Sequence, residues 1–332
     1  LGMTAVIFFG AYRIAGGQTE PGALVAFTSF FTIILNAVIS VSRVFVELSR
    51  GSASAKRIAE VLDMPADLLP EQCPEDTSGA LIRFENVTFS YGGAPALQDI
   101  SFSMRKGESL GVIGATGSGK STLVSLLLRF YDATEGAVYV DGKNVKSYEK
   151  AELCKKFGIV FQNDFLMASS VRENIDFERG LSDEDVGQAA EYARAADFIR
   201  EHEGYEGILT ARGGNYSGGQ KQRLLIARAL AAKPEILILD DSSSALDYRT
   251  DASLRKTLLE NLSETAVVMI AQRISSVRFA DHILVLDGGK MVGFGTDEQL
   301  MRTCETYRRI YRSQHDDEII GKGGEPYAGA GA

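Results

Sequence analysis

The sequence has 332 residues, of which 45% are apolar and 24% charged, and a net charge of −9. This length allows about two domains, and the acidic balance excludes a protein built to neutralise nucleic-acid phosphates, so we expect no nucleic-acid partner. Three scattered cysteines, Cys73, Cys154 and Cys304, exclude a disulfide framework and a zinc site. The chain begins at Leu1 with no signal-peptide layout, which predicts an internal piece of a longer polypeptide.

Residues 1–62 predict the end of a membrane domain. Residues 21–42 contain no charged residue. A stretch of this length is about long enough to cross a bilayer as a helix. A buried helix of a soluble protein is the alternative, but such helices are usually shorter and amphipathic. Residues 1–12 are apolar but too short to span, so we expect the remainder of a preceding helix and an external turn at 16–21. Basic residues follow the span and place its C-terminal end in the cytoplasm by the positive-inside rule: Arg43, Arg50, Lys56 and Arg57.

A different pattern follows this segment. Residues 63–79 contain three prolines and predict a linker. From residue 80 we expect a strand at 81–84, a turn and a second strand at 87–90, after which strand and helix signals alternate. Alternation of this kind predicts an α/β domain with a largely parallel sheet, over residues 80–316. The end of the chain, 317–332, is rich in Gly and Ala and is expected to be a disordered tail.

Residues 114–121 match the phosphate-binding pattern G-x-x-x-x-G-K-[ST] at every fixed position. An apolar strand precedes the loop at 109–113 and an apolar-faced helix follows at 121–130, a context that disfavours a chance glycine-rich turn. Lys120 is expected to reach the β- and γ-phosphates of a nucleoside triphosphate, and the Ser121 hydroxyl to hold Mg²⁺. The predicted contacts of this loop are Gly114, Ala115, Thr116, Gly117, Ser118, Gly119, Lys120, Ser121 and Thr122.

Two more motifs follow. Residues 215–223 read Asn-Tyr-Ser-Gly-Gly-Gln-Lys-Gln-Arg, so that Ser217, Gly218, Gly219 and Gln220 precede a helix predicted at 224–232. A serine and two glycines at a helix start can form an anion site for a γ-phosphate. Residues 236–240 are large aliphatics ending in Asp240, which predicts a strand buried on both faces with an acid where open α/β sheets place ligands. Paired with the loop at 114–121, Asp240 is predicted to hold Mg²⁺.

Together these motifs resemble ATP-binding-cassette (ABC) proteins, because Ser-Gly-Gly-Gln is the signature of that family. The resemblance covers residues 80–316, and 1–62 resemble the last transmembrane helices of an ABC exporter. It implies a P-loop NTPase fold with a parallel-sheet core, an antiparallel β subdomain and a helical subdomain, using ATP and Mg²⁺. It further implies that Tyr91 stacks on adenine and that Gln162 touches Mg²⁺. Asp247, in the segment 244–247, would bridge two nucleotide sites.

Two positions depart from the family pattern. The general base after Asp240 is normally Glu and here is Asp241, one methylene shorter, which withdraws the carboxylate by about 1.5 Å. A misplacement of about 1 Å can cost on the order of a hundredfold in rate. The switch residue is normally His and here is Gln272, whose amide has no proton to exchange near neutral pH. The three histidines lie elsewhere in the sequence, at His202, His282 and His315.

The pair Asp241 and Gln272 resembles the degenerate-site half of heterodimeric ABC exporters. The chain would then be one subunit of a multi-pass plasma-membrane exporter with its ATPase domain in the cytoplasm. It would hold slowly hydrolysed ATP, with Lys120, Asp241 and Gln272 as catalytic residues, and lend its signature to the active site of a different partner subunit. The expected cargo is an amphipathic, lipid-like or peptide substrate. A soluble ABC ATPase of DNA repair or translation and a slow homodimeric exporter are the alternatives.

Overall fold

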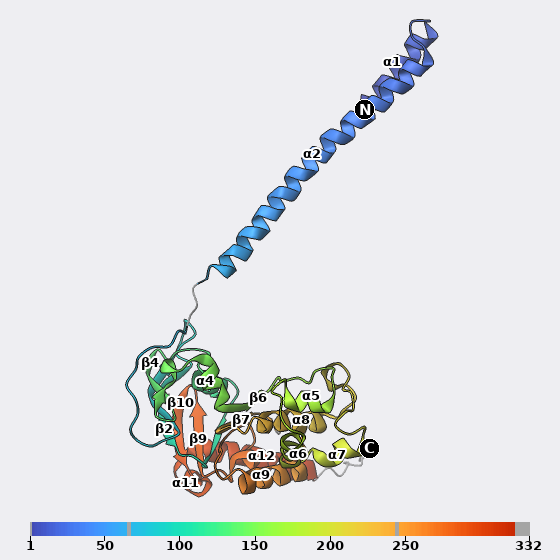
Figure 1. Ribbon diagram of the computed structural model, residues 1–332. Helices are drawn as coiled ribbons and strands as arrows, with labels where there is room; N and C mark the ends of the chain where they lie inside the picture. The colour runs from blue at the N-terminus through green and yellow to red at the C-terminus, as the bar shows by residue number, and fades with distance from the viewer. Residues whose placement is uncertain (1, 65–67, 243–245, 323–332) are drawn as a thin grey trace, which may run out of the picture. The chain divides into compact units, whose positions relative to one another are not determined.

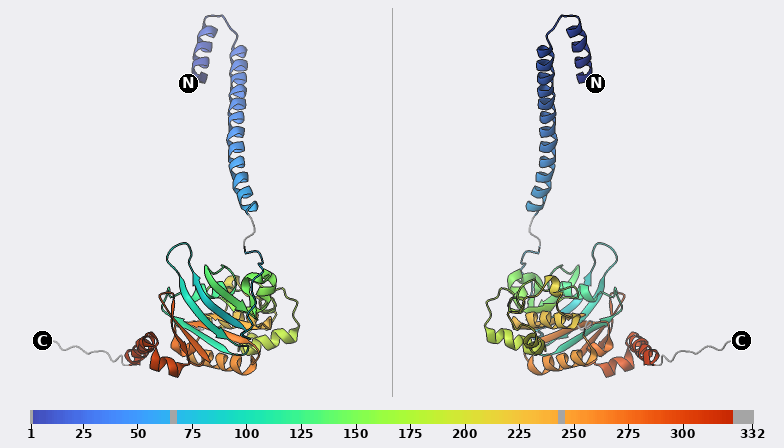
Figure 2. Two further views of the ribbon diagram at one scale, coloured as in Figure 1. Left: turned by 90° about the vertical axis from the view of Figure 1, so that its left-hand side faces the viewer. Right: turned by 90° about the vertical axis from the view of Figure 1, so that its right-hand side faces the viewer.

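The computed structural model describes residues 2–64, 68–242 and 246–322, and it divides into a unit up to residue 67 and a unit from residue 68 onward. The first unit consists of α1 (Gly2–Ala15) and α2 (Pro21–Leu62), which run antiparallel on either side of a short turn (Figure 2). Pro21 stands in the first turn of α2, where its missing N–H leaves no bond unmade. Among the described helices, α2 alone is long and apolar enough to cross a membrane. Residues 21–62 thus form one continuous helix, which contains the span predicted at 21–42.

The second unit contains a ten-stranded sheet whose strands follow the order β5-β4-β1-β2-β10-β9-β3-β8-β7-β6. Strands β9, β3, β8, β7 and β6 pair in parallel, whereas β1 pairs antiparallel with both β2 and β4. These are the parallel core and the antiparallel subdomain that the sequence predicts. Across the sheet the strands are β5 (Lys143–Asn144), β4 (Glu135–Val140), β1 (Ile82–Phe89), β2 (Leu97–Met104), β10 (Lys290–Gly295), β9 (His282–Asp287), β3 (Ser109–Gly114), β8 (Ala266–Ala271), β7 (Ile236–Asp240) and β6 (Phe157–Val160).

Helices cover this sheet on both faces, and α5 to α8 gather on the side of the unit away from β2 and β4 (Figure 1). The helices are α3 (Lys120–Leu127), α4 (Lys150–Lys155), α5 (Val171–Asp176), α6 (Asp183–Tyr192), α7 (Ala196–Glu201), α8 (Gly218–Ala231), α9 (Tyr248–Asn261), α10 (Ile274–Val277), α11 (Asp297–Thr303) and α12 (Glu305–Lys322), with short 3₁₀ turns at Val145–Ser147 and Ala211–Gly213.

Strand β7 shows why the sequence of a strand in the parallel core is an unbroken run of apolar residues. Ile236 and Ile238 pack into a core shared with β1, β2 and α3, while Leu237 and Leu239 pack into a second core shared with the helices α5 to α8. Every residue of β7 is buried, because both faces of the strand are covered. The strand predicted from its aliphatic run is therefore present with the expected ends.

The prediction for the start of this unit is wrong. The two strands predicted at 81–84 and 87–90 are one strand, β1, in which the pairing shifts between Phe84 and Val87. Asn86 lies between them with a φ of +48°. An extra residue in a β-bulge bends a strand without ending it, so a residue type that is common in turns lies within the strand here. At the other end α12 runs to Lys322, so the predicted boundary at 316 falls inside a helix, and residues 323–332 lie outside the described chain.

Candidate nucleotide site

The glycine-rich loop joins β3 to α3 in a backbone conformation that requires glycine. Gly117 has a φ of +79° and Gly119, which precedes α3, a φ of +102°. A Cβ atom on Gly119 would lie 2.6 Å from Leu97 Cδ2 and 2.8 Å from the Ala96 carbonyl oxygen, whereas nothing lies within 4 Å of the corresponding point at Gly117. The loop therefore packs against β2 on one side and is open on the other. An open loop backbone at a helix N-terminus is suited to an anion.

Lys120 is held across this loop. Its Nζ donates to the carbonyl oxygens of Gly114, at 2.8 Å, and Ala115, at 2.9 Å. Burial lowers the pKa of the Lys120 ammonium, although Asp240 and Asp241 oppose that shift. The Lys120 ammonium thus binds two neutral carbonyl oxygens, which it can exchange for a more negative partner.

The polar groups of this site lie at the ends of four neighbouring strands. Because β3, β8, β7 and β6 are parallel and adjacent, their carboxyl ends meet at one edge of the sheet. The loop at 114–121 follows β3, Gln272 follows β8, Asp240 and Asp241 end and follow β7, and Gln162 follows β6. Ligand sites of open α/β sheets form at this edge.

These residues surround a cavity of about 250 Å³. Within it Gln272 Nε2 donates to Asp241 Oδ2 at 3.4 Å, a long hydrogen bond. Burial raises the pKa of Asp240, and the neighbouring Asp241 carboxylate raises it further. Burial also raises the pKa of Asp241. The lining residues are Ala96, Thr116, Gly117, Gly119, Lys120, Ser121, Thr122, Gln162, Asp240, Asp241, Ile270, Ala271 and Gln272.

Tyr91 stands beside the loop without lining the cavity. Its hydroxyl is 3.3 Å from Thr122 Oγ1, and its ring packs edge-on against Phe89 and Tyr131. Tyr91 remains 57% exposed, which leaves aromatic surface free for a planar ligand. Tyr131, which the sequence reasoning missed, is part of the support for this ring.

The signature residues and Asp247 do not line the cavity. Ser217 precedes α8, and its hydroxyl accepts from Gln220 N at 3.3 Å while Gln220 Oε1 accepts from Ser217 N at 2.9 Å, a reciprocal helix cap. The helix predicted from 224 begins instead at Gly218, directly after this cap. Asp247 similarly caps α9 through Arg249 N and Thr250 N. Ser217, Gly218 and Asp247 are exposed, so both helix starts are open to solvent. Residues 243–245 of the predicted bridging segment lie outside the described chain.

The donor set fits a nucleoside triphosphate with a hard divalent cation. The buried Ser118 hydroxyl has no hydrogen-bond partner among the described residues, which is a costly condition for a buried polar group. Ser121, Gln162 and Asp240 bring a hydroxyl, an amide and a carboxylate oxygen to one cavity. Oxygen donors of these types are the ligands that Mg²⁺ takes beside substrate phosphates.

Arg228 of α8 is a second residue that the sequence reasoning missed. Its guanidinium is buried and donates to the Asn174 carbonyl at 2.8 Å, to Asn174 Oδ1 at 3.0 Å and to the Phe165 carbonyl at 3.0 Å. It thereby ties the helix after the signature to the segment that follows Gln162. The available signal was a lone charge inside the apolar run 224–232.

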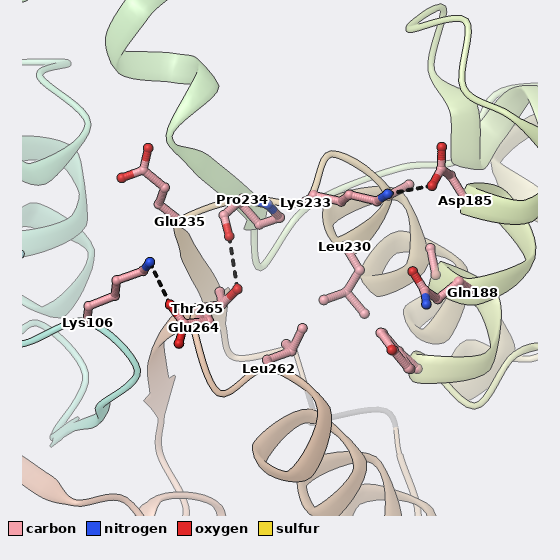
Figure 3. Close-up of a pocket in the computed structure, with 13 residues that line it drawn as sticks. Lys106, Asp185, Gln188, Leu230, Lys233, Pro234, Glu235, Leu262, Glu264 and Thr265 are labelled. Carbon is pink, nitrogen blue, oxygen red and sulfur yellow. Dashed lines mark hydrogen bonds and ion pairs between the residues drawn. The ribbon is translucent and has the colours of Figure 1, made fainter.

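A second cavity of about 300 Å³ lies at the opposite, amino-terminal edge of the parallel strands (Figure 3). Its lysines already have carboxylate partners, since Lys106 lies 2.7 Å from Glu264 and Lys233 2.6 Å from Asp185. Leu230 and Leu262 form its apolar part (Figure 3). With its cations paired and no glycine-rich loop among its lining residues, this cavity is a poor phosphate site.

Comparison with known proteins agrees with the geometry. The family model described as ABC transporter matches residues 97–244, which include the glycine-rich loop, the signature and Asp240. The chain contains an ABC transporter ATP-binding domain. An uncharacterized ABC transporter ATP-binding protein of Mycobacterium bovis is 40% identical over 326 residues, which are 96% of this chain and 56% of that relative.

Two further matches extend over the helices that precede the ABC domain. An ATP-dependent lipid A-core flippase of Syntrophus aciditrophicus is 32% identical over 97% of this chain and 54% of its own length. Among solved structures, a bacterial Atm1-family ABC exporter with ATP bound matches with a TM-score of 0.75 and 30% identity, over 94% of this chain and 56% of that chain. The chain therefore spans about half the length of the relatives it matches.

Proposed function

We propose that this ABC domain binds ATP with Mg²⁺ in the cavity of about 250 Å³ and hydrolyses it slowly. The observation that carries the proposal is the meeting of Lys120, Asp240, Asp241 and Gln272 in one cavity beside the open glycine-rich loop. Loop N–H groups and Lys120 would bind the β- and γ-phosphates, and Tyr91 would stack on adenine. Ser121, Gln162 and Asp240 would hold Mg²⁺, whose charge neutralises that of the phosphates.

Asp241 would orient the attacking water and accept its proton, and Gln272 would donate a hydrogen bond to the γ-phosphate. Asp241 is one methylene short of the family's base, and Gln272 supplies only a neutral amide. The exposed N-terminus of α8, with Ser217 and the two glycines, would instead complete the active site of a partner subunit.

We further propose that the full protein is one half of a heterodimeric exporter in the plasma membrane, with the ABC domain in the cytoplasm. The apolar helix α2 and the matches to a flippase and an Atm1-family exporter support membrane transport. An amphipathic, lipid-like or peptide substrate is the proposed cargo. A soluble DNA-repair or translation ATPase is disfavoured by α2, and recovery of the protein in the cytosolic fraction would revive it.

The test is the ATPase rate of the purified full-length transporter, with whichever second subunit co-purifies. Asp241→Asn is the matched change at this chain's own site, because Asn tolerates the positive φ of +49° at this position as well as Asp does. It should leave most of the activity, since turnover would occur at the partner's site. Ser217→Arg, which blocks the anion site, should abolish turnover. Near-total loss with Asp241→Asn, or full activity with Ser217→Arg, would contradict the degenerate-site proposal.

A further inference from the structure

The C-terminal helix α12 holds the segment that carries Gln272. Gln314 Nε2 donates to the Gln272 carbonyl oxygen at 2.7 Å, and Gln314 Oε1 accepts from Ile274 N at 2.9 Å. One side-chain amide thus bridges both ends of the turn between β8 and α10. In sequence Gln314 lies far from every motif of the nucleotide site.

The two hydrogen bonds complete a helix start that has no cap of its own. Arg273 precedes α10 and makes no side-chain capping bond, so the first N–H groups of that short helix depend on other partners. Gln314 supplies the partner for Ile274 N from another element. A residue of α12 thus holds the backbone directly after the Cα atom from which the Gln272 side chain starts.

The position of α12 is itself well defined. Tyr307 is fully buried, and its hydroxyl donates to Asp297 Oδ1 at 2.6 Å. Ile310 packs against the same core. Gln314 follows Tyr307 by two helical turns and Ile310 by about one, so it projects from the same side of the helix toward the core. A displacement of α12 would therefore disturb the hydrogen bond between Gln314 and the Gln272 carbonyl oxygen.

We propose that Gln314 is a positioning residue that holds Gln272 toward the γ-phosphate position, which makes α12 part of the machinery that distinguishes ATP from ADP. The inference rests on the proposed function, in which Gln272 meets the γ-phosphate. Gln314 itself touches only the backbone of the turn. Loss of Gln314 should therefore weaken the binding of ATP and leave the binding of ADP unchanged.

The experiment uses the full-length transporter in lipid nanodiscs, with azido-ATP labelling of this subunit competed by ATP or by ADP. The variant is Gln314→Met, which keeps a good helix former of similar length and removes both hydrogen bonds. We expect competition by ATP to weaken by about 3-fold to 10-fold, the worth of one neutral hydrogen bond, and competition by ADP to stay within twofold. Gln188→Ala changes an exposed glutamine of α6 with no hydrogen bond among the described residues, and should alter neither.

A double mutant separates positioning from mere structural support. In Gln272→Ala the backbone carbonyl remains, so Gln314→Met still removes the same two hydrogen bonds, yet it should no longer change the preference for ATP. Equal weakening of ATP and ADP, or a further loss of ATP preference in the Gln272→Ala background, would overturn the inference.

Lys120→Ala serves as the control for the proposed function, because it should abolish most labelling of this subunit. If Lys120→Ala labels normally, the proposed nucleotide site is wrong. If Lys120→Ala loses labelling and Gln314→Met keeps the wild-type ratio of ATP to ADP affinity, only the role of Gln314 is wrong. Should Gln314→Met fold poorly, faster hydrogen exchange over 272–274 in Gln314→Ala, with the same loss of ATP preference, tests the same link.

Discussion

Replacing Lys120 by Ala removes the cation that faces the glycine-rich loop, and its effect on nucleotide affinity can be worked out from the contacts it makes. A hydrogen bond that involves a charged group contributes about 1.5–3 kcal/mol. In the structure Lys120 donates two bonds to carbonyl oxygens, at 2.8 and 2.9 Å. Binding of ATP therefore exchanges partners for the ammonium group instead of adding two bonds. The net loss in Lys120→Ala should be near the value of a single bond, about 1.5–3 kcal/mol, or about 10-fold to 150-fold in Kd.

The assay is azido-ATP labelling of this subunit in the purified full-length transporter, titrated far enough above the wild-type Kd to label Lys120→Ala, which at azido-ATP concentrations near the wild-type Kd loses most of its labelling. Lys233→Ala is the control, because this lysine lines the cavity at the opposite edge of the sheet (Figure 3) and is paired with Asp185. It should leave the Kd for ATP unchanged. A Kd in Lys120→Ala within twofold of wild type would refute the placement of the phosphates at this loop, and an equal loss in Lys233→Ala would point to a general loss of structure.

Three further outcomes are expected. Tyr91→Ala should weaken ATP by about 1–3 kcal/mol, the worth of one stacked base, and leave tripolyphosphate binding unchanged; equal losses would make Tyr91 a structural residue. Asp240→Asn should raise the melting temperature of the nucleotide-free protein at neutral pH, because burial raises the pKa of this carboxyl and penalises its charged form. That gain should shrink as pH falls from the raised folded-state pKa toward the unfolded value near 3.8, and a gain that grows with acid would contradict it. Arg228→Met should lower the melting temperature, since it strips buried carbonyls of their donor, whereas an unchanged value would show that water replaces the guanidinium.

That the glycine-rich loop and Asp240 meet at one cavity could be predicted, because each motif is local in sequence. The loop at 114–121 and the aliphatic strand ending at Asp240 each carry their own pattern, and parallel strands bring such ends to one edge without further information. The strand β1 could not be read in the same way. Asn86 resembles a turn residue in sequence, and only its pairing across β2 and β4 shows that the strand continues as a bulge.

Contacts between distant segments explain the other omissions. Gln314 meets Gln272 across 42 positions of the chain, and Arg228 meets Phe165 across 63. The sequence around a glutamine on a polar helix face, or around an arginine in an apolar helix, does not indicate which distant residue its side chain contacts. The aromatic support of Tyr91 by Tyr131 is likewise a contact between segments that lie far apart in the sequence. Such residues become visible only when the fold places them.

If this site hydrolyses ATP slowly, as we propose, the geometry indicates which property of Asp241 would be limiting. Burial raises the pKa of this carboxyl, and a base with a pKa closer to neutrality is better matched to accept a proton. Basicity therefore would not account for the slow turnover that we propose. The side chain is one methylene shorter than that of the family's glutamate, and Gln272 already donates to it at 3.4 Å. The short reach of the Asp241 side chain is the remaining property that would limit hydrolysis. It follows that moving the carboxylate forward in Asp241→Glu acts on the limiting property, whereas a change that only alters its pKa does not.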